Sequence, residues 1–463
     1  MTSVAQQLRE SRWIARWFLS ATEKRYQMLA FLSLMSWALA APLTPLFLDH
    51  YYTYMISATL TSVVTAYIVS AKLLRRAAGL TQQQSSLRER FTSHPWHFFL
   101  AGMGIWSILS FLFAAEDKLR ALKGGVNLKE GLTAYCFYAM LYAMAVLLTE
   151  EKKRKAVQLT MIFGSIVPSL CFWLIEFGFT RYDRGKIGVW LTVMTHHRAS
   201  IYRNSNYYGY YLTVILVLTA AYLVSTKKMK LQAPLWCVFV LNVITLVVND
   251  TLGAFVAVLL SLILIPVLYS IREKFRIRYL IPLAVFVGLA VWVNLGFFWE
   301  EIGIAAGSVT RNYMSLRSDI GNLIEGNEAA AHAGSGRWAL WQVAWDVMLE
   351  HPLFGCGPEQ MVFYMEERVS TPFVWPHNEY LQHAAALGIP AGLMYLAALG
   401  SMAFTQIKRV KILRDTTLMA GCMVVGYAIS AFFGGTTYTT APYMFLALGL
   451  TSLRDYEHRE AEA

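Results

Sequence analysis

Three polar side chains in a row, His377, Asn378 and Glu379, follow Pro376 and stand just before a long apolar run. A helix that begins here would depress the pKa of the imidazole, because the N-terminus of a helix carries partial positive charge. A histidine that is neutral at working pH can accept a proton, as a general base must. We therefore expect His377 to be a base, against the alternative of a plain interfacial histidine. Asn378 and Glu379 would either orient it or cap the helix, and the sequence leaves both roles open.

Arginine is the second residue type that could do chemistry. Its planar guanidinium binds phosphate through paired, charge-assisted hydrogen bonds. Arg337 follows Gly334-Ser335-Gly336 and opens a helical pattern. Four further arginines lie in segments that we place on the same side of a membrane: Arg198, Arg203, Arg311 and Arg317. A solvated helix face, or anchoring to lipid head groups, is the alternative for each of them.

The composition is that of a polytopic membrane protein. Of the 463 residues, 56% are hydrophobic and 15% are charged, whereas a soluble domain has about 25% charged residues. Apolar runs long enough to cross a bilayer recur along the whole chain. We predict an all-α membrane protein with about twelve transmembrane helices, near 28–48, 52–72, 97–115, 131–149, 156–177, 205–225, 232–249, 252–270, 279–298, 383–405, 416–434 and 438–453.

Lysine and arginine predict the orientation. The two termini and five connecting loops on one side hold 27 of these residues, and the loops on the other side hold 13. By the positive-inside rule the first side is cytoplasmic. The predicted organisation is a cytoplasmic or interfacial segment (1–27), nine transmembrane helices (28–299), a large periplasmic loop (300–382), and three more transmembrane helices with a cytoplasmic tail (383–463). The net charge of +11 is then mainly a topology signal, which argues against a nucleic-acid partner.

The periplasmic loop 300–382 should contain helices of its own. A helical pattern begins near Trp338 and ends at His351-Pro352, and a second short helix follows Pro358. The density of tryptophan and phenylalanine predicts that these helices form a cap over the ends of the transmembrane helices. Loops of this length are usually functional.

The outer side of a cytoplasmic membrane restricts the substrate. It has no ATP and no nucleotide-activated sugars, so a substrate used there must arrive already activated, typically as a polyprenyl pyrophosphate. The sequence has no Asp-x-Asp pair, phosphate-binding glycine loop, dinucleotide pattern or Gly-x-Ser-x-Gly elbow. We therefore expect chemistry that needs no metal and no cofactor.

Three stretches resemble a known family. SGRWALWQVAWDVMLEHPLFGCGPEQM, then WPHNEYLQHAAALGIPAGLMYL, and upstream YRNSNYYGYYL resemble the signatures of the O-antigen ligase and polymerase superfamily. The resemblance implies a GT-C-like glycosyltransferase of the bacterial inner membrane, with its active site facing the periplasm. Its donor would be a glycan on undecaprenyl pyrophosphate. For a ligase, the acceptor would be a sugar hydroxyl of lipid A–core, and the product lipopolysaccharide.

The resemblance also assigns residues. The family's histidine corresponds to His377 and its Ser-Gly-Arg arginine to Arg337, while Asn206 belongs to the upstream Asn-x-Asn-x-x-Gly pattern. One departure concerns the span after the seventh, where the family often has a Ser-Arg pair and this chain reads VVNDTLGAFVA. A phosphate contact from that position must be absent or come from Arg198, Arg203, Arg311 or Arg317.

Three other functions stay open. An O-antigen polymerase, or a protein O-oligosaccharyltransferase, would use the same lipid-linked donor. A non-catalytic transporter of lipid-linked glycans also suits twelve transmembrane helices. Transporters, however, more often place ionisable residues inside the spans, whereas here the polar residues gather at the outer ends.

Overall fold

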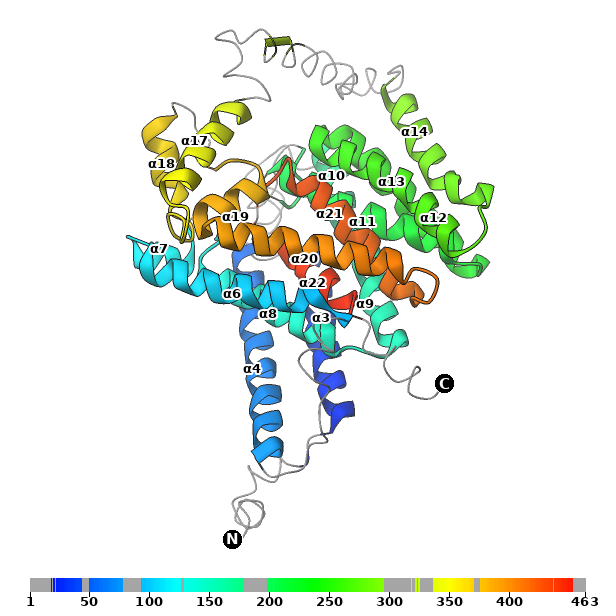
Figure 1. Cartoon of the computed structure of the whole chain (residues 1–463). Coiled ribbons are helices and arrows are strands. Elements are labelled where there is room, and N and C mark those ends of the chain that lie inside the picture. Colours follow the sequence, from blue (N-terminus) through cyan, green and yellow to red (C-terminus); the bar gives the residue numbers. More distant parts are fainter. Residues whose placement is uncertain are drawn as a thin grey trace, which may run out of the picture.

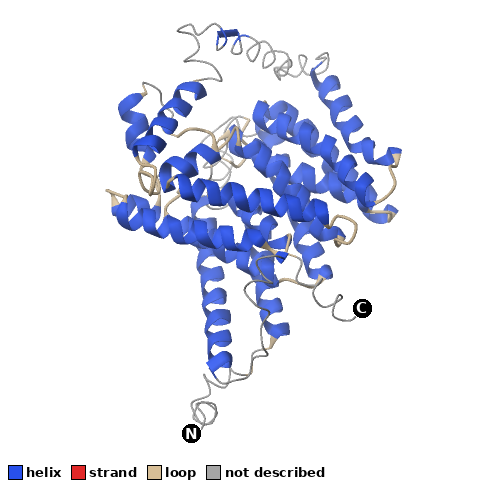
Figure 2. Ribbon diagram, viewed as in Figure 1, coloured by secondary structure: helices blue, strands red, loops and turns tan. Residues whose placement is uncertain are grey.

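The computed structural model describes residues 18, 20, 22–43, 50–77, 93–125, 129–177, 198–202, 204–294, 318, 321–322, 324, 336–369, 375–435 and 437–452. Within these residues the regular structure is helical and no strand occurs (Figure 2). The predicted all-α fold is confirmed. The N-terminal interfacial segment and most of residues 295–335 lie outside the described part of the chain.

Helices occur at all twelve positions where the sequence predicts a transmembrane helix (Figure 1). They are α3 (Glu23–Leu43), α4 (His50–Ala77), α6 (Pro95–Phe113), α8 (Leu132–Leu147), α9 with α10 (Glu151–Gly164, Ile166–Glu176), α11 (Ser205–Ser225), α12 (Met229–Asn249), α13 (Leu252–Arg272), η2 with α14 (Ile277–Leu280, Ile281–Asn294), α20 (Ile389–Lys408), α21 (Asp415–Ala431) and α22 (Ala441–Leu450). Among the described residues, eight helices are long and apolar enough to cross a membrane, and α8, α21 and α22 are shorter apolar helices. The protein is therefore a multi-pass membrane protein.

Helix α11 forms the centre of the bundle. Every residue from Tyr207 to Val224 is buried, as expected for a helix that is apolar on all sides. It packs against α12, α13 and α21, while α6 lies along α20 and α8 along α22. These contacts fix the position of α11, including its first turn, in the bundle.

The predicted outer segments meet at one end of the bundle, which we call the site end. It comprises α7 (Lys118–Lys123), α17 (Arg337–Glu350), α18 (Met361–Arg368), α19 (Glu379–Leu387) and the first turns of α8 and α11. Asp117 N–H donates to Gln360 Oε1 at 3.1 Å, which joins the first outer segment to the loop after α17. The two helices predicted within the 300–382 loop are confirmed as α17 and α18.

The turn after α17 contains Gly355 and Gly357, and we call it the glycine turn. It fixes α19 to α17. Helix α19 ends at a break before α20, so its last carbonyl groups lack partners within the helix. Cys356 N–H donates to Ala385 O at 3.0 Å, and Gly357 N–H donates to Ala386 O at 2.9 Å. Gly355 and Gly357 have φ values of +68° and +100°, which glycine adopts without steric cost. The His-Pro-Leu-Phe-Gly-Cys-Gly-Pro sequence thus serves to seat the α17–α18 cap on the helix that follows His377.

Candidate functional site

His377 lies in the short connection that leads into α19. Its side chain is only 4% exposed, and its ring centroid lies 5.9 Å from that of Trp375. Trp341 of α17 holds the same connection, since its Nε1 donates to Pro376 O at 2.8 Å. His377 has φ = +50°, a left-handed conformation that is strained for a histidine. The surrounding contacts therefore fix the backbone conformation at His377.

Arg337 is the first residue of α17, and its charge acts on both His377 and Tyr210 of α11. It hydrogen-bonds to the hydroxyl of Tyr210, which in turn donates to Phe433 O at 2.5 Å. Burial, and then the charge of Arg337, lowers the pKa of His377 to about 3. The two predicted catalytic residues are thus brought together, and the imidazole is neutral at ordinary pH.

The cause of the lowered pKa differs from the expected one. The sequence pointed to the N-terminus of the following helix as the main influence. In the structure, burial contributes most and the Arg337 guanidinium contributes next. Neither could be known from the local sequence, because both depend on where α17 packs.

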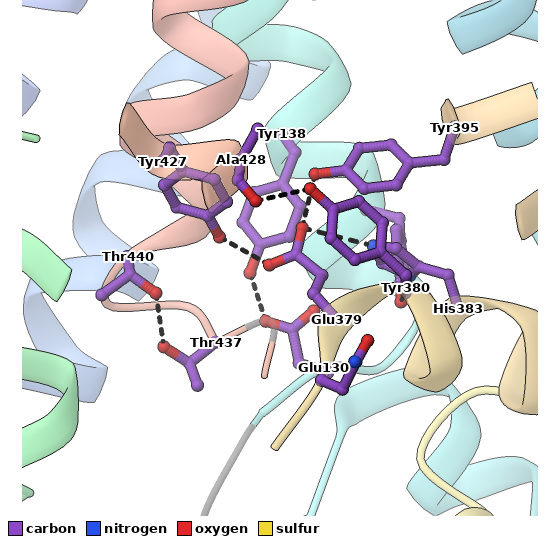
Figure 3. Close-up of polar contacts among 12 residues, drawn as sticks. Glu130, Tyr138, Glu379, Tyr380, His383, Tyr395, Tyr427, Ala428, Thr437 and Thr440 are labelled. Carbon is purple, nitrogen blue, oxygen red and sulfur yellow. Dashed lines mark hydrogen bonds and ion pairs between the residues drawn. The ribbon is translucent and has the colours of Figure 1, made fainter. Parts of the chain in front are cut away.

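Asn378 and Glu379 have different roles. Asn378 is the N-cap of α19, and its side chain accepts a hydrogen bond from Leu381 N–H at 3.1 Å, so the capping alternative is confirmed for it. The Glu379 carboxylate is 1% exposed and accepts hydrogen bonds from Tyr395 at 2.6 Å and Tyr427 at 2.8 Å (Figure 3). Glu379 therefore joins α19 to α20 and α21 and fixes the start of the helix that follows His377.

Two further buried carboxyl groups, those of Glu130 and Glu359, lie at the site end, and neither was predicted from the sequence. Glu130 accepts a 2.5 Å hydrogen bond from Tyr138, and its backbone N–H donates to Glu359 Oε1 at 2.9 Å. Burial raises the pKa of Glu130 well above its ordinary value, and Glu359 and Glu379 raise it further, although the Tyr138 hydrogen bond opposes them. Figure 3 shows Glu130 and Glu379 facing the same interior region between the helices. A single glutamate before each apolar run was the only sequence signal.

Arg198 lies at the opening of α13. Its Nη1 atom is 2.6 Å from Asp250 Oδ2, and Asn249 Nδ2 donates to its carbonyl oxygen at 2.5 Å. This is the turn where the sequence lacks the family's Ser-Arg pair, so the fold supplies an arginine there from another segment. The side chain is already paired with a carboxylate, and its role as a phosphate ligand stays a prediction.

The other predicted residues are placed as follows. Asn206 lies in the first turn of α11, where its N–H donates to the N-cap Asn204 Oδ1 at 2.8 Å. Arg203, Arg311 and Arg317 lie outside the described residues. No group of three or more histidine, cysteine, aspartate or glutamate side chains that could hold a metal ion occurs in the part of the chain that the structure describes.

Backbone strain is concentrated at the site end. Six non-glycine residues in the described ranges have positive φ: Lys129, Arg198, Ser200, Asp250, Glu359 and His377. All six lie in connections at this end of the bundle. Such conformations each cost about 1–3 kcal/mol and persist where the surroundings fix them, commonly at functional sites.

A family model described as O-antigen ligase matches residues 237–396. The match covers about a third of the chain and includes α13, α14, α17, α18 and α19. This segment belongs to the O-antigen ligase and polymerase superfamily. Both Arg337 and His377 lie within the O-antigen ligase match, whereas Arg198, Asn206 and the Asn-x-Asn-x-x-Gly sequence precede it. A search of curated proteins gave no match. The matched segment therefore implies a glycosyltransferase-like enzyme of the O-antigen ligase and polymerase kind.

Proposed function

We propose that the protein is an O-antigen ligase. It would transfer a polysaccharide from undecaprenyl pyrophosphate to a sugar hydroxyl of lipid A–core, on the periplasmic face of the bacterial inner membrane. The observation that carries the proposal is a buried, neutral imidazole, His377, that lies within the electrostatic influence of the Arg337 guanidinium. A group-transfer reaction from a pyrophosphate to a hydroxyl needs one base and at least one cation, and this pair supplies both.

The reaction would proceed in one displacement. His377 takes the proton from the acceptor hydroxyl while that oxygen attacks the anomeric carbon of the donor. A new glycosidic bond forms as the bond between the anomeric carbon and the pyrophosphate oxygen breaks. Arg337 neutralises the charge that the leaving pyrophosphate gains. A direct displacement inverts the configuration at the anomeric carbon and uses no metal ion.

The donor itself would tune the base. A pKa of about 3 keeps His377 neutral but makes it a weak proton acceptor. A pyrophosphate bound to Arg337 offsets one of the two causes of that low pKa, because an anion beside an imidazole favours the protonated form. His377 would therefore become a stronger base when the donor is bound, so it would accept a proton mainly when transfer can follow.

The remaining arginines are candidates for further contacts with the donor. Arg198 would use the guanidinium N–H groups that do not face Asp250, while Arg203, Arg311 and Arg317 are proposed on sequence alone. Asn206, at the start of α11, would support the same region from the bundle side. The isoprenoid tail would lie among the transmembrane helices.

Transfer between purified components tests the proposal. The protein in lipid nanodiscs would be mixed with a polysaccharide on undecaprenyl pyrophosphate and with lipid A–core. The His377→Asn variant removes the base but suits a left-handed backbone, so it separates the imidazole from the strain. We expect His377→Asn and Arg337→Gln each to lower the rate by about 100-fold or more. His351→Asn is the matched control, because His351 contacts Tyr364 in the cap at 3.0 Å and has no role in transfer.

The products separate the alternatives. Polysaccharide on lipid A–core identifies a ligase, and inversion of the linkage is read from the anomeric coupling constant. Longer lipid-linked polymer in the absence of lipid A–core identifies a polymerase. Absence of any new glycosidic bond, with the donor moved across the bilayer, identifies a transporter. Near wild-type transfer by His377→Asn would refute the assignment of the base.

A further inference from the structure

A groove of about 1010 Å³ runs beside the His377 connection. One wall is the face of α17, the other is the first turn of α19 with Tyr380, and Phe432 closes it from the end of α21. Asn378, the neighbour of His377, is part of the lining. The groove is therefore continuous with the candidate site.

Three tryptophans line the α17 wall. Trp338, Trp341 and Trp345 have a spacing of three and four residues, which places them along one side of the helix. The opposite side, with Leu340, Ala344 and Val347, is buried against α18 and α19. Trp338 and Trp345 are 38% and 53% exposed. The rings of Trp338 and Trp345 therefore offer exposed faces to a ligand, whereas Trp341 also bonds to Pro376 and contacts Phe432.

Polar groups alternate with the rings. Gln342 and Asp346 of α17, and Asn378 opposite them, also line the groove. The cation there, Arg368, is held by Glu350 through two hydrogen bonds of 2.8 Å each, so its charge is neutralised. A phosphate head group would need a less engaged cation, and an isoprenoid tail would leave the amide and carboxylate groups without partners.

Sugar rings match this lining. A pyranose presents a face of C–H groups, which packs on an aromatic ring, and an edge of hydroxyl groups, which bonds to amides and carboxylates. We propose that the groove binds the glycan of the lipid-linked donor. The proposal rests on the proposed function, and it assigns Trp338, Trp341 and Trp345 as the surface along which that glycan lies.

The position of the groove favours the donor over the acceptor. Trp338 directly follows Arg337, and Trp341 bonds to the residue before His377. The first sugar of the donor is joined to the pyrophosphate that Arg337 would hold, so the next sugars must leave from this point. Residues 338–345 extend for about 10 Å along the helix axis, which is more than one sugar ring.

Two donors on the same carrier lipid test the proposal, one with a polysaccharide and one with a single sugar. We expect Trp338→Ala and Trp345→Ala each to raise the KM for the polysaccharide donor by about tenfold, the loss of one aromatic contact. The KM for the single-sugar donor should change much less at Trp345, which lies further along the helix from Arg337. Trp338→Phe and Trp345→Phe keep an aromatic face and should retain most of the affinity.

Trp292→Ala on α14 is the matched control, since this tryptophan is 52% exposed and does not line the groove. Equal increases in KM for both donors in Trp345→Ala would assign the groove to the lipid tail, and a change in the KM for lipid A–core alone would assign it to the acceptor. Either result, or unchanged kinetics in both alanine variants, overturns the inference.

A further measurement distinguishes failure of the inference from failure of the proposed function. The donor polysaccharide, released from its lipid by mild acid, is titrated into the protein and tryptophan fluorescence is followed. Quenching that is lost in Trp345→Ala supports the groove even if no transfer occurs. Transfer that depends on His377 without any such quenching supports the proposed function and overturns the groove.

Discussion

The imidazole of His377 is buried within the electrostatic influence of the Arg337 guanidinium, and burial together with that positive charge lowers its pKa to about 3. Arg337 is the first residue of α17, whereas His377 lies in the connection that precedes α19. Their relative position therefore depends on the glycine turn and on the Trp341 hydrogen bond to Pro376. The electrostatic state of the base is a property of the assembled cap.

The first prediction concerns pH. Because His377 acts when neutral, kcat/KM should stay level as the pH falls from about 8 to about 5 and decline only as the folded pKa is approached. Arg337→Gln removes the positive charge, so the pKa of His377 should rise and the acid decline should move toward neutral pH. Measuring the transfer rate of the wild-type protein, and the remaining transfer of Arg337→Gln, across this pH range checks the prediction. A wild-type decline between about pH 7 and 6, near the ordinary histidine pKa, would contradict the lowered pKa.

The second prediction concerns Glu379, which we regard as a positioning residue. Glu379→Ala leaves the hydroxyls of Tyr395 and Tyr427 without their acceptor inside the protein, at a cost of about 1–3 kcal/mol for each buried group. The thermal unfolding midpoint in detergent should fall clearly for Glu379→Ala and less for Glu379→Gln, which keeps one acceptor oxygen. Tyr395→Phe, which removes one of the two donors, should fall between wild type and Glu379→Ala. An unchanged midpoint in Glu379→Ala would show that the network does not hold α19.

Local sequence patterns were sufficient to predict the helices and to single out two candidate site residues. Apolar runs predicted the positions of the transmembrane helices, and Pro352 and Pro358 marked the limits of the cap helices. His377 and Arg337 were singled out because each stands at the start of a helical pattern, His377 in a row of three polar residues and Arg337 after Gly334-Ser335-Gly336. The partners of Glu379 could not be predicted from the local sequence, because they are on α20 and α21.

The rest of the site depends on contacts between distant segments. Glu130 and Glu359 are 229 residues apart in the chain and meet through a hydrogen bond from the Glu130 backbone N–H to the Glu359 carboxylate. Arg198 and Asp250 are 52 residues apart. Neither pair has a spacing signal, and only the packing of the helices creates them. The same applies to the pKa of His377, since burial has no local signature in a sequence that is apolar almost throughout.

The third prediction concerns metal ions. In the proposed reaction guanidinium groups neutralise the leaving pyrophosphate, so a divalent cation has no required role. Excess chelator should change the transfer rate by no more than about twofold, which corresponds to less than about 1 kcal/mol in the activation free energy. The assay uses purified components with no added divalent cation, and magnesium is added back as the control. A large loss that magnesium restores would show that a metal ion takes part.

The fourth prediction concerns Gly388, between α19 and α20. Its φ is +95°, and a Cβ atom there would collide with the carbonyl oxygen of Leu353 in the glycine turn. Gly388→Ala should therefore lower the unfolding midpoint, because strain of about 1–3 kcal/mol is added and the turn is pushed away from α19. Gly400→Ala is the matched control, since nothing lies within 4 Å of its Cβ position in the interior of α20, and it should stabilise by about 0.5–1 kcal/mol. Transfer should fall in Gly388→Ala beyond the loss of folded protein, because displacing the turn moves the approach to His377. If both alanine variants behave alike, the packing of the α17–α18 cap on α19 does not position His377.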